Sequence, residues 1–196
     1  MPDGYNGRIL RIDLSASSIS VEEPPQEFYR KYMGGSALGL YYLLNEMPVG
    51  ADPLGPDNML ALSLSVVTGA PVSGQSRMTA SAKSPLSGMI GDSQCGGFWP
   101  AKLKFAGFDA IIIKGRAASP VYLWIDDGRA ELKDASHIWG QTTGDAQAAI
   151  MQELGDEKDI EILQIGPAGE KLVRYASLIN MCNRANGRTG MGAVMG

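Results

Sequence analysis

The chain has 196 residues, of which 44% are hydrophobic and 19% charged, a composition typical of a globular protein rather than a disordered one. Its net charge of −4 argues against nucleic acid or an anionic membrane surface as the main partner, and no apolar run approaches the ~18 residues of a membrane span. Cys95 and Cys182 form no CxxC pair and His137 is the only histidine, so a zinc site made of Cys and His is nearly excluded.

The first half of the chain predicts a hairpin, a helical region and two strands. Residues 7–15 and 19–23, separated by a serine-rich turn, are typical of a β-hairpin. From Gln26 the spacing of apolar residues becomes helical, and the Gly34-Gly35 pair either divides two helices or kinks one. Further strands are expected at 59–67 and 77–84.

The second half predicts a short helix over 98–107 and a hairpin with Asp127-Gly128 at its turn. A helix is expected over 142–155, with Asp145 or Thr143 as its N-cap. Strands are expected at 110–115, 121–126, 160–166 and 173–180. No repeat or linker divides the chain, so we predict one α+β domain, rich in hairpins, with about nine strands and three helices.

The usual catalytic residues are scarce in this sequence. We interpret His137, in the segment DASHIWG, as a structural residue of a turn rather than a general base, and Asp126-Asp127 as a hairpin turn rather than a carboxylate pair. One cysteine beside two glycines is more often a small packed residue than a metal ligand or reactive thiol, and we interpret Cys95 in that way.

The distribution of charged residues along the chain says more about function than the few catalytic residue types do. Residues 58–91 contain Arg77 and Lys83 but no Asp or Glu, and residues 171–196 contain four basic residues, again without an acid. Both windows combine arginine with glycine, serine and threonine, the residue types that bind anions through guanidinium groups and backbone N–H groups. These windows therefore indicate a site for an anionic ligand.

A glycine pair lies between the two windows. Gly96-Gly97, in GDSQCGGFWP, precedes the helix expected over 98–107, so free amides there would face a phosphate, although the same glycines also suit a plain tight turn. The terminal GMGAVMG misses the dinucleotide-binding fingerprint, and no Gly-Lys-Ser/Thr follows it. Ordinary NAD and ATP sites are therefore poorly supported.

Several ordered motifs together resemble the amino-terminal domain of the aldehyde:ferredoxin oxidoreductase family. The resemblance runs from about Tyr5 to Gly196, essentially the whole chain. It implies a β-rich base of two sheets with helices at the side, on which a bis-pterin cofactor rests. The motifs are GRILRIDLS, YMGGSALGLYYLL, DPLGPDN, TGAPVSGQSRMTASAKSPLSG, LKFAGFDAIIIKGRAASPVYLWI, DASHIWG, IGPAGEKLVRYASLIN and RANGRTGMGAVMG.

The resemblance also implies an activity. Members of the family are tungsten, sometimes molybdenum, enzymes that oxidise aldehydes to carboxylic acids and pass electrons through a [4Fe-4S] cluster to ferredoxin. A magnesium ion bridges the phosphates of the two pterins. The cluster ligands belong to later, mostly helical C-terminal domains, so residues 1–196 are expected to be a single cofactor-cradling domain that is inactive alone. A homo-oligomer and a cytoplasmic location are also expected.

The resemblance assigns cofactor contacts by motif. Arg77 is expected to contact the pterin or its phosphate, and the main-chain carbonyls of Gln94 and Ala185 are expected to bind the magnesium ion. Gln94 departs from the asparagine of the archaeal enzymes, a change that a main-chain contact survives. The complete expected set is Arg77, Gln94, Gly96, Arg184, Ala185, Gly187 and Arg188.

A second function of a different class stays open on the sequence. The same glycine and arginine cradle would suit a non-catalytic binding or assembly module, which holds another phosphorylated ligand or a partner subunit. The two hypotheses differ in whether the protein takes up tungsten or molybdenum together with a pterin.

Overall fold

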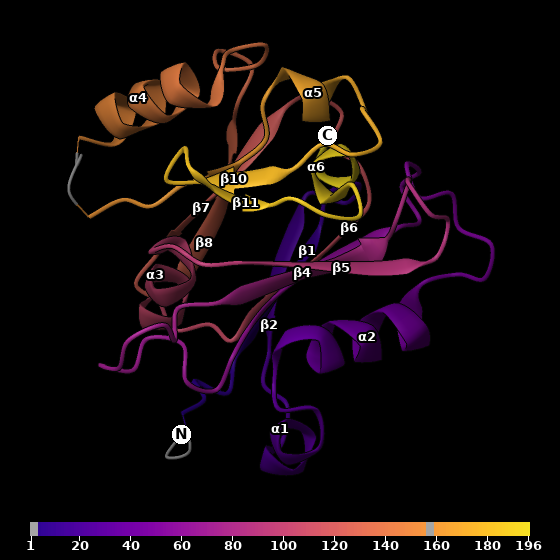
Figure 1. The fold of residues 1–196 in the computed structure, drawn as a ribbon, viewed down its shortest axis with the longest axis vertical. Coiled ribbons are helices and arrows are strands. Elements are labelled where there is room, and N and C mark those ends of the chain that lie inside the picture. The colour runs from indigo at the N-terminus through magenta and orange to yellow at the C-terminus, as the bar shows by residue number, and fades with distance from the viewer. Residues whose placement is uncertain (1–3, 156–158) are drawn as a thin grey trace.

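A six-stranded sheet is the largest element of the fold in the computed structural model, which describes residues 4–155 and 159–196 (Figure 1). Its strand order is β2-β1-β6-β3-β4-β5, and every pair is antiparallel except β1 with β6. These strands are β1 (Ile9–Asp13), β2 (Ser18–Glu22), β3 (Met59–Leu64), β4 (Met78–Lys83), β5 (Ile90–Cys95) and β6 (Ala110–Lys114).

Two smaller sheets and six helices surround this sheet in the described part of the chain. β9 (Leu163–Gln164), β10 (Leu178–Asn180) and β11 (Arg184–Asn186) form a three-stranded sheet, and β7 (Val121–Asp126) pairs with β8 (Arg129–Asp134) as a hairpin. The helices are α1 (Gln26–Tyr32), α2 (Gly35–Glu46), α3 (Trp99–Phe105), α4 (Thr143–Leu154), α5 (Pro167–Glu170) and α6 (Met191–Met195).

Both faces of the large sheet are covered, which explains why β3 is buried along its whole length. Alternate residues of a strand point to opposite faces. Leu60 and Leu62 accordingly pack with Met191 of α6, whereas Met59 and Ala61 pack with α1 and α2. Figure 1 shows α2 beneath the sheet and β10, β11 and α6 on its other side.

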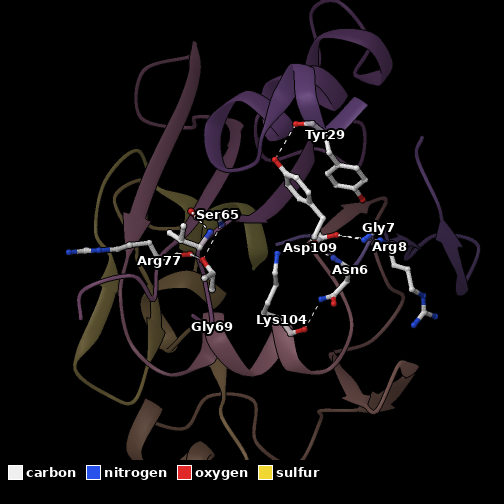
Figure 2. Close-up of polar contacts among 12 residues, drawn as sticks. Asn6, Gly7, Arg8, Tyr29, Ser65, Gly69, Arg77, Lys104 and Asp109 are labelled. Carbon is white, nitrogen blue, oxygen red and sulfur yellow. Dashed lines mark hydrogen bonds and ion pairs between the residues drawn. The ribbon is translucent and has the colours of Figure 1, made fainter. Parts of the chain in front are cut away.

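A buried carboxylate ties the N-terminal segment to the sheet. Asp109 is 2% exposed and accepts hydrogen bonds from the backbone N–H groups of Asn6 (3.0 Å) and Gly7 (2.7 Å). The Lys104 ammonium lies 2.6 Å from the same carboxylate (Figure 2). Charge and hydrogen bonds thus compensate the cost of burying this carboxylate, and the N-terminal segment meets the distant region of residues 104–109 there.

The predicted α+β architecture is confirmed, with some corrections. The hairpin of β1 and β2, the division of α1 from α2 at Gly34-Gly35, and the strands β3, β4, β6 and β7 lie where they were expected. The described strands form three sheets rather than two, because β7 and β8 pair only with each other. The described part also holds eleven strands and six helices, more than the nine and three expected.

Other expectations about local structure were wrong. β5 forms from residues for which no strand was expected, and the terminal segment that was given no helix contains α6. The strand expected at 160–166 is reduced to the two residues of β9. The N-cap of α4 is Thr142, one residue before the expected Thr143, and its hydroxyl accepts from the N–H of Asp145 at 3.3 Å.

Removing the buried carboxylate should destabilise the fold strongly. Asp109→Ala is expected to lower the free energy of unfolding by about 3–5 kcal/mol, because Lys104 would remain buried without its partner charge. Equilibrium denaturation with urea would measure this change. Asp126→Ala, at an exposed position of β7, serves as the control and should change stability by less than about 0.5 kcal/mol. Equal losses in the two variants would contradict the role given to Asp109.

Candidate functional site

Three segments distant in sequence converge beside the end of β5. Residues 75–77 precede β4, residues 94–97 end β5, and residues 184–188 include β11. The Ser76 hydroxyl donates to the carbonyl of Gly97 at 2.5 Å, which joins the first segment to the second. The N–H of Arg188 donates to the Ser93 hydroxyl at 3.1 Å, which joins the third segment to β5.

Two arginines lie on either side of the glycine pair. A Cβ built on Gly96 would lie 3.8 Å from Nη1 of Arg77, and one built on Gly97 would lie 3.3 Å from Cγ of Arg184. Both arginine side chains are exposed, and Figure 2 shows the Arg77 guanidinium extending away from the body of the protein. The glycines therefore leave the chain open between two positive charges.

The hydrogen-bond pattern of β4 shows which way the backbone of β5 faces. Lys83 donates its N–H to the side chain of Asn58, on the β3 side, at 3.1 Å. Ser84 donates its N–H to the carbonyl of Met89, on the β5 side, at 2.8 Å. In an antiparallel ladder successive residues alternate in this manner, so every second residue of β4 bonds to β5.

Gln94 belongs to the set that does not bond to β4. Its partner is Thr79, four residues before Lys83, and Thr79 therefore faces β3. The N–H and C=O of Gln94 then point to the open side of β5, the last strand of the sheet. The carbonyl of Asp92 points the same way and accepts from the Thr189 hydroxyl at 3.2 Å. A main-chain carbonyl at this edge is a ligand type suited to a hard cation.

The third segment presents the remaining predicted residues. β10 and β11 form a hairpin whose turn contains Met181 and Cys182 at positive φ, 53° and 54°. After the turn only Asn186 is buried, because its side chain reaches toward β5. The exposed residues of this segment are Arg184, Ala185, Gly187 and Arg188. All seven expected residues thus lie in the three converging segments.

Three buried polar side chains lie under these segments. The Cys95 thiol donates to Oδ1 of Asn186 at 3.0 Å, and the Asn186 amide donates to the carbonyl of Ser93 at 2.6 Å. The Asn180 amide donates to the Cys95 sulfur at 3.3 Å and to the carbonyl of Gly96 at 3.2 Å. Burial raises the pKa of the Cys95 thiol to about 11, so it stays neutral at physiological pH. Its interpretation as a packed residue is confirmed.

The electrostatic character of the site favours anions. Arg77, Arg184 and Arg188 are exposed around it. Asp92 is an acid on β5, but its carboxylate accepts a hydrogen bond from the hydroxyl of Ser36 in α2. This carboxylate therefore lies on the face that α2 covers. The guanidinium groups suit phosphate, which they bind through paired hydrogen bonds.

His137 and the Asp126-Asp127 pair, which were considered as catalytic groups, have structural roles, as expected. Nε2 of His137 lies 3.1 Å from the carboxylate of Glu153, which also accepts from the Tyr122 hydroxyl at 2.8 Å, so His137 links its turn to α4. Asp127 has φ 41° in the turn between β7 and β8. Within residues 4–155 and 159–196, no group of three or more His, Cys, Asp and Glu could hold a metal, and no helix is long and apolar enough to cross a membrane.

Sequence reasoning did not single out Ser76, Asn180 or Asn186. One signal was present, because Asn180 follows the buried Leu178 by two residues and the alternation of a strand puts both on one face. The contacts of these residues, however, join positions 21 to 93 residues apart, and no local pattern reports them.

Comparison with known proteins identifies the family. The family model described as "Aldehyde ferredoxin oxidoreductase, N-terminal domain" matches residues 9–196. The chain belongs to this family. Two proteins named "Tungsten-containing aldehyde ferredoxin oxidoreductase", from Pyrococcus furiosus and Thermococcus kodakarensis, are each 45% identical to it over 193 residues. Those residues are 98% of this chain and 32% of each relative, so the chain spans about a third of their length.

A solved structure agrees with this aldehyde ferredoxin oxidoreductase N-terminal domain. It is titled "Active site complex BamBC of Benzoyl Coenzyme A reductase in complex with 1,5 Dienoyl-CoA", and it matches with a TM-score of 0.96 at 33% identity. The match covers 100% of this chain and 30% of the solved chain. The fold expected from the resemblance is therefore confirmed.

The two cysteines should differ sharply in reactivity. Cys182 is exposed, whereas Cys95 is 4% exposed and has its thiol pKa raised to about 11. Because thiolate is the reactive form, iodoacetamide at pH 8 should label about one thiol per folded chain and both after denaturation. Mass spectrometry would count the labels, and Cys182→Ser should abolish labelling of the folded chain. Labelling of Cys95 in that folded variant would contradict its burial.

Proposed function

We propose that this domain binds a tungsten-bis-pterin cofactor and forms part of an enzyme that oxidises aldehydes to carboxylic acids, with ferredoxin as the electron acceptor. The observation that supports this most strongly is that Arg77 and Arg184 flank the glycine pair at the end of β5, while the exposed Arg188 is tied by its N–H to Ser93 of the same strand. The relatives named as tungsten-containing aldehyde ferredoxin oxidoreductases support the metal and the reaction.

The residues present fit the phosphates of such a cofactor. A pterin phosphate needs cationic groups and N–H donors, and exposed arginines next to a glycine pair provide both without steric hindrance. We assign phosphate and pterin-edge contacts to Arg77, Arg184 and Arg188, with Gly96 and Gly187 providing close backbone approach. When bound, the tungsten-pterin group supplies the redox chemistry, and the protein supplies orientation and electrostatics.

Magnesium is the second part of the proposal. The carbonyl of Gln94 points to the open edge of β5, and Ala185 lies exposed on β11. Both segments are held to the buried layer that Cys95, Asn180 and Asn186 form, the first through Cys95 and the second through Asn186. We propose that these two carbonyls bind a magnesium ion that bridges the pterin phosphates, because oxygen ligands suit this hard cation. Tungsten and molybdenum would both suit the same protein contacts.

Electron transfer to ferredoxin requires parts of the enzyme outside residues 1–196. Cys95 is buried with a neutral thiol, and the Cys182 thiol faces Gln147 of α4, so we assign neither cysteine to a [4Fe-4S] cluster. Aldehyde access and cluster binding are accordingly assigned to the C-terminal domains. Self-association and the cytoplasmic location stay predictions.

Removing the two flanking arginines should empty the site. In the full-length protein that contains this chain, Arg77→Ala combined with Arg184→Ala is expected to lower bound tungsten and pterin at least tenfold, because two charge-assisted contacts to phosphate are lost. Elemental analysis by mass spectrometry and pterin fluorescence after oxidation would measure both per chain. Arg30→Ala, at an exposed position of α1, is the matched control and should retain a full complement.

The same measurement separates the two functions considered for this chain. A wild-type protein with neither tungsten nor molybdenum and no pterin would overturn the enzyme proposal. Binding of another phosphorylated ligand that depends on Arg77 and Arg184 would then favour the non-catalytic binding module.

The side chain of Gln94 should matter little if its carbonyl is the ligand. Gln94→Asn and Gln94→Ala are expected to keep magnesium, tungsten and pterin contents within about twofold of the wild type, because both substitutions retain the main-chain oxygen. Elemental analysis of the purified full-length variants would check this. Loss of magnesium in Gln94→Ala, with retention in Gln94→Asn, would show that the side chain rather than the backbone makes the contact.

A further inference from the structure

The two peptides that flank the Gly97 Cα, Gly96–Gly97 and Gly97–Phe98, are each held by one side chain. The Asn180 amide donates to the carbonyl of Gly96 at 3.2 Å, and the Ser76 hydroxyl donates to the carbonyl of Gly97 at 2.5 Å. Asn180 is fully buried on β10, whereas Ser76 lies half-buried before β4. Two successive carbonyls are thus turned toward the protein by residues from two different segments.

This arrangement decides where the N–H of Gly97 points. In a trans peptide the C=O and N–H groups point in opposite directions, so a Gly96 carbonyl directed at Asn180 turns the Gly97 N–H away from Asn180. Within the described part of the chain, no protein acceptor bonds to this N–H. The Arg77 guanidinium lies against Gly96 and the stem of the Arg184 side chain lies against Gly97, so the side chains of two basic residues flank this N–H. A free N–H in that setting suits an anionic oxygen.

Only glycine fits beside Asn180. Gly97 has φ 113°, and a Cβ built there would lie 2.1 Å from Oδ1 of Asn180, a distance no side chain tolerates. Because glycine has no Cβ, a Gly-Gly peptide also rotates easily, so glycine alone does not keep the N–H in one direction. The hydrogen bonds from Asn180 and Ser76 supply that constraint.

We propose that Asn180 and Ser76 are positioning residues, which fix the Gly96–Gly97 and Gly97–Phe98 peptides respectively and so lock Gly97 with its N–H directed to a phosphate oxygen of the bound cofactor. This inference rests on the proposed function and adds a backbone donor to the arginine contacts. Without these hydrogen bonds, the Gly96–Gly97 peptide would be able to rotate and direct the Gly96 carbonyl at the phosphate. The carbonyl oxygen and the phosphate would then repel each other, because both carry negative charge. A donor oriented before the ligand arrives costs no reorganisation on binding.

The buried layer explains how Asn180 itself is kept in place. Its amide also donates to the Cys95 sulfur at 3.3 Å, and Cys95 donates in turn to Asn186. Asn180 is therefore oriented by β5 and acts on the residues that immediately follow β5. Ser76, in the segment that leads into β4, holds the following peptide, Gly97–Phe98, through the carbonyl of Gly97.

Variants of the full-length protein would test the lock. Ser76→Ala removes the hydrogen bond to the Gly97 carbonyl and Asn180→Ala the one to the Gly96 carbonyl, whereas Ser76→Thr keeps the hydroxyl. Asn58→Ala is a matched control, because Asn58 is also buried and its amide donates to two carbonyls, those of Pro53 (2.7 Å) before β3 and Lys83 (3.0 Å) at the last residue of β4. The measurements are the rate of pterin loss during dialysis, tungsten per chain and the midpoint of thermal unfolding.

Ser76→Ala and Asn180→Ala are expected to lose pterin on the order of ten times faster than the wild type, and Ser76→Thr should behave as the wild type. Asn58→Ala should lower the unfolding midpoint while the folded protein retains pterin. A wild type loaded with pterin, together with unchanged retention in Ser76→Ala, would overturn the lock and leave the proposed function intact. A wild type without pterin would overturn both. If Asn180→Ala does not fold, the comparison of Ser76→Ala with Ser76→Thr decides.

Discussion

The candidate site depends on one buried junction between two sheets. Cys95 at the end of β5, Asn180 on β10 and Asn186 on β11 exchange hydrogen bonds at positions closed to water. Buried amides cost free energy unless they are bonded, so their partners restrict how the two sheets meet. An apolar contact would allow the hairpin of β10 and β11 to slide along β5. The hydrogen bonds specify a single alignment of this hairpin on β5. They therefore also fix the relative positions of the exposed segments that form the candidate site.

The remainder of the fold gives this junction a firm support. β5 is the outermost strand of a sheet whose inner strand β3 is buried on both faces, and α2 covers one face near β4. Asp109 holds the N-terminal segment to α3 and β6 with charge and hydrogen bonds (Figure 2). The core is thus packed where rigidity is needed, and the backbone is left open along one strand edge.

Much of this architecture was predictable from local patterns, and the exceptions have physical causes. The division between α1 and α2 was visible because Gly34, at φ 128°, interrupts a helical pattern. β5 was missed because glycine, aspartate and glutamine have weak strand propensity, and its pairing with β4 is what stabilises it. The arginines of the site were expected from the family resemblance. Ser76 and Asn180 were not, since their role exists only where distant segments meet.

The open edge of β5 also bears on how freely this site can change over evolutionary time. A main-chain carbonyl is present whatever the residue type, so a ligand of this kind depends on the path of the backbone rather than on one side chain. With the magnesium contact that we propose for the Gln94 carbonyl, a substitution of this side chain leaves the ligand atom in place, provided that the ladder with β4 keeps its register. Gly97 has no such freedom, because Oδ1 of Asn180 occupies the space of any side chain. Two positions three residues apart, one on β5 and one just after it, are thus under different selective constraints.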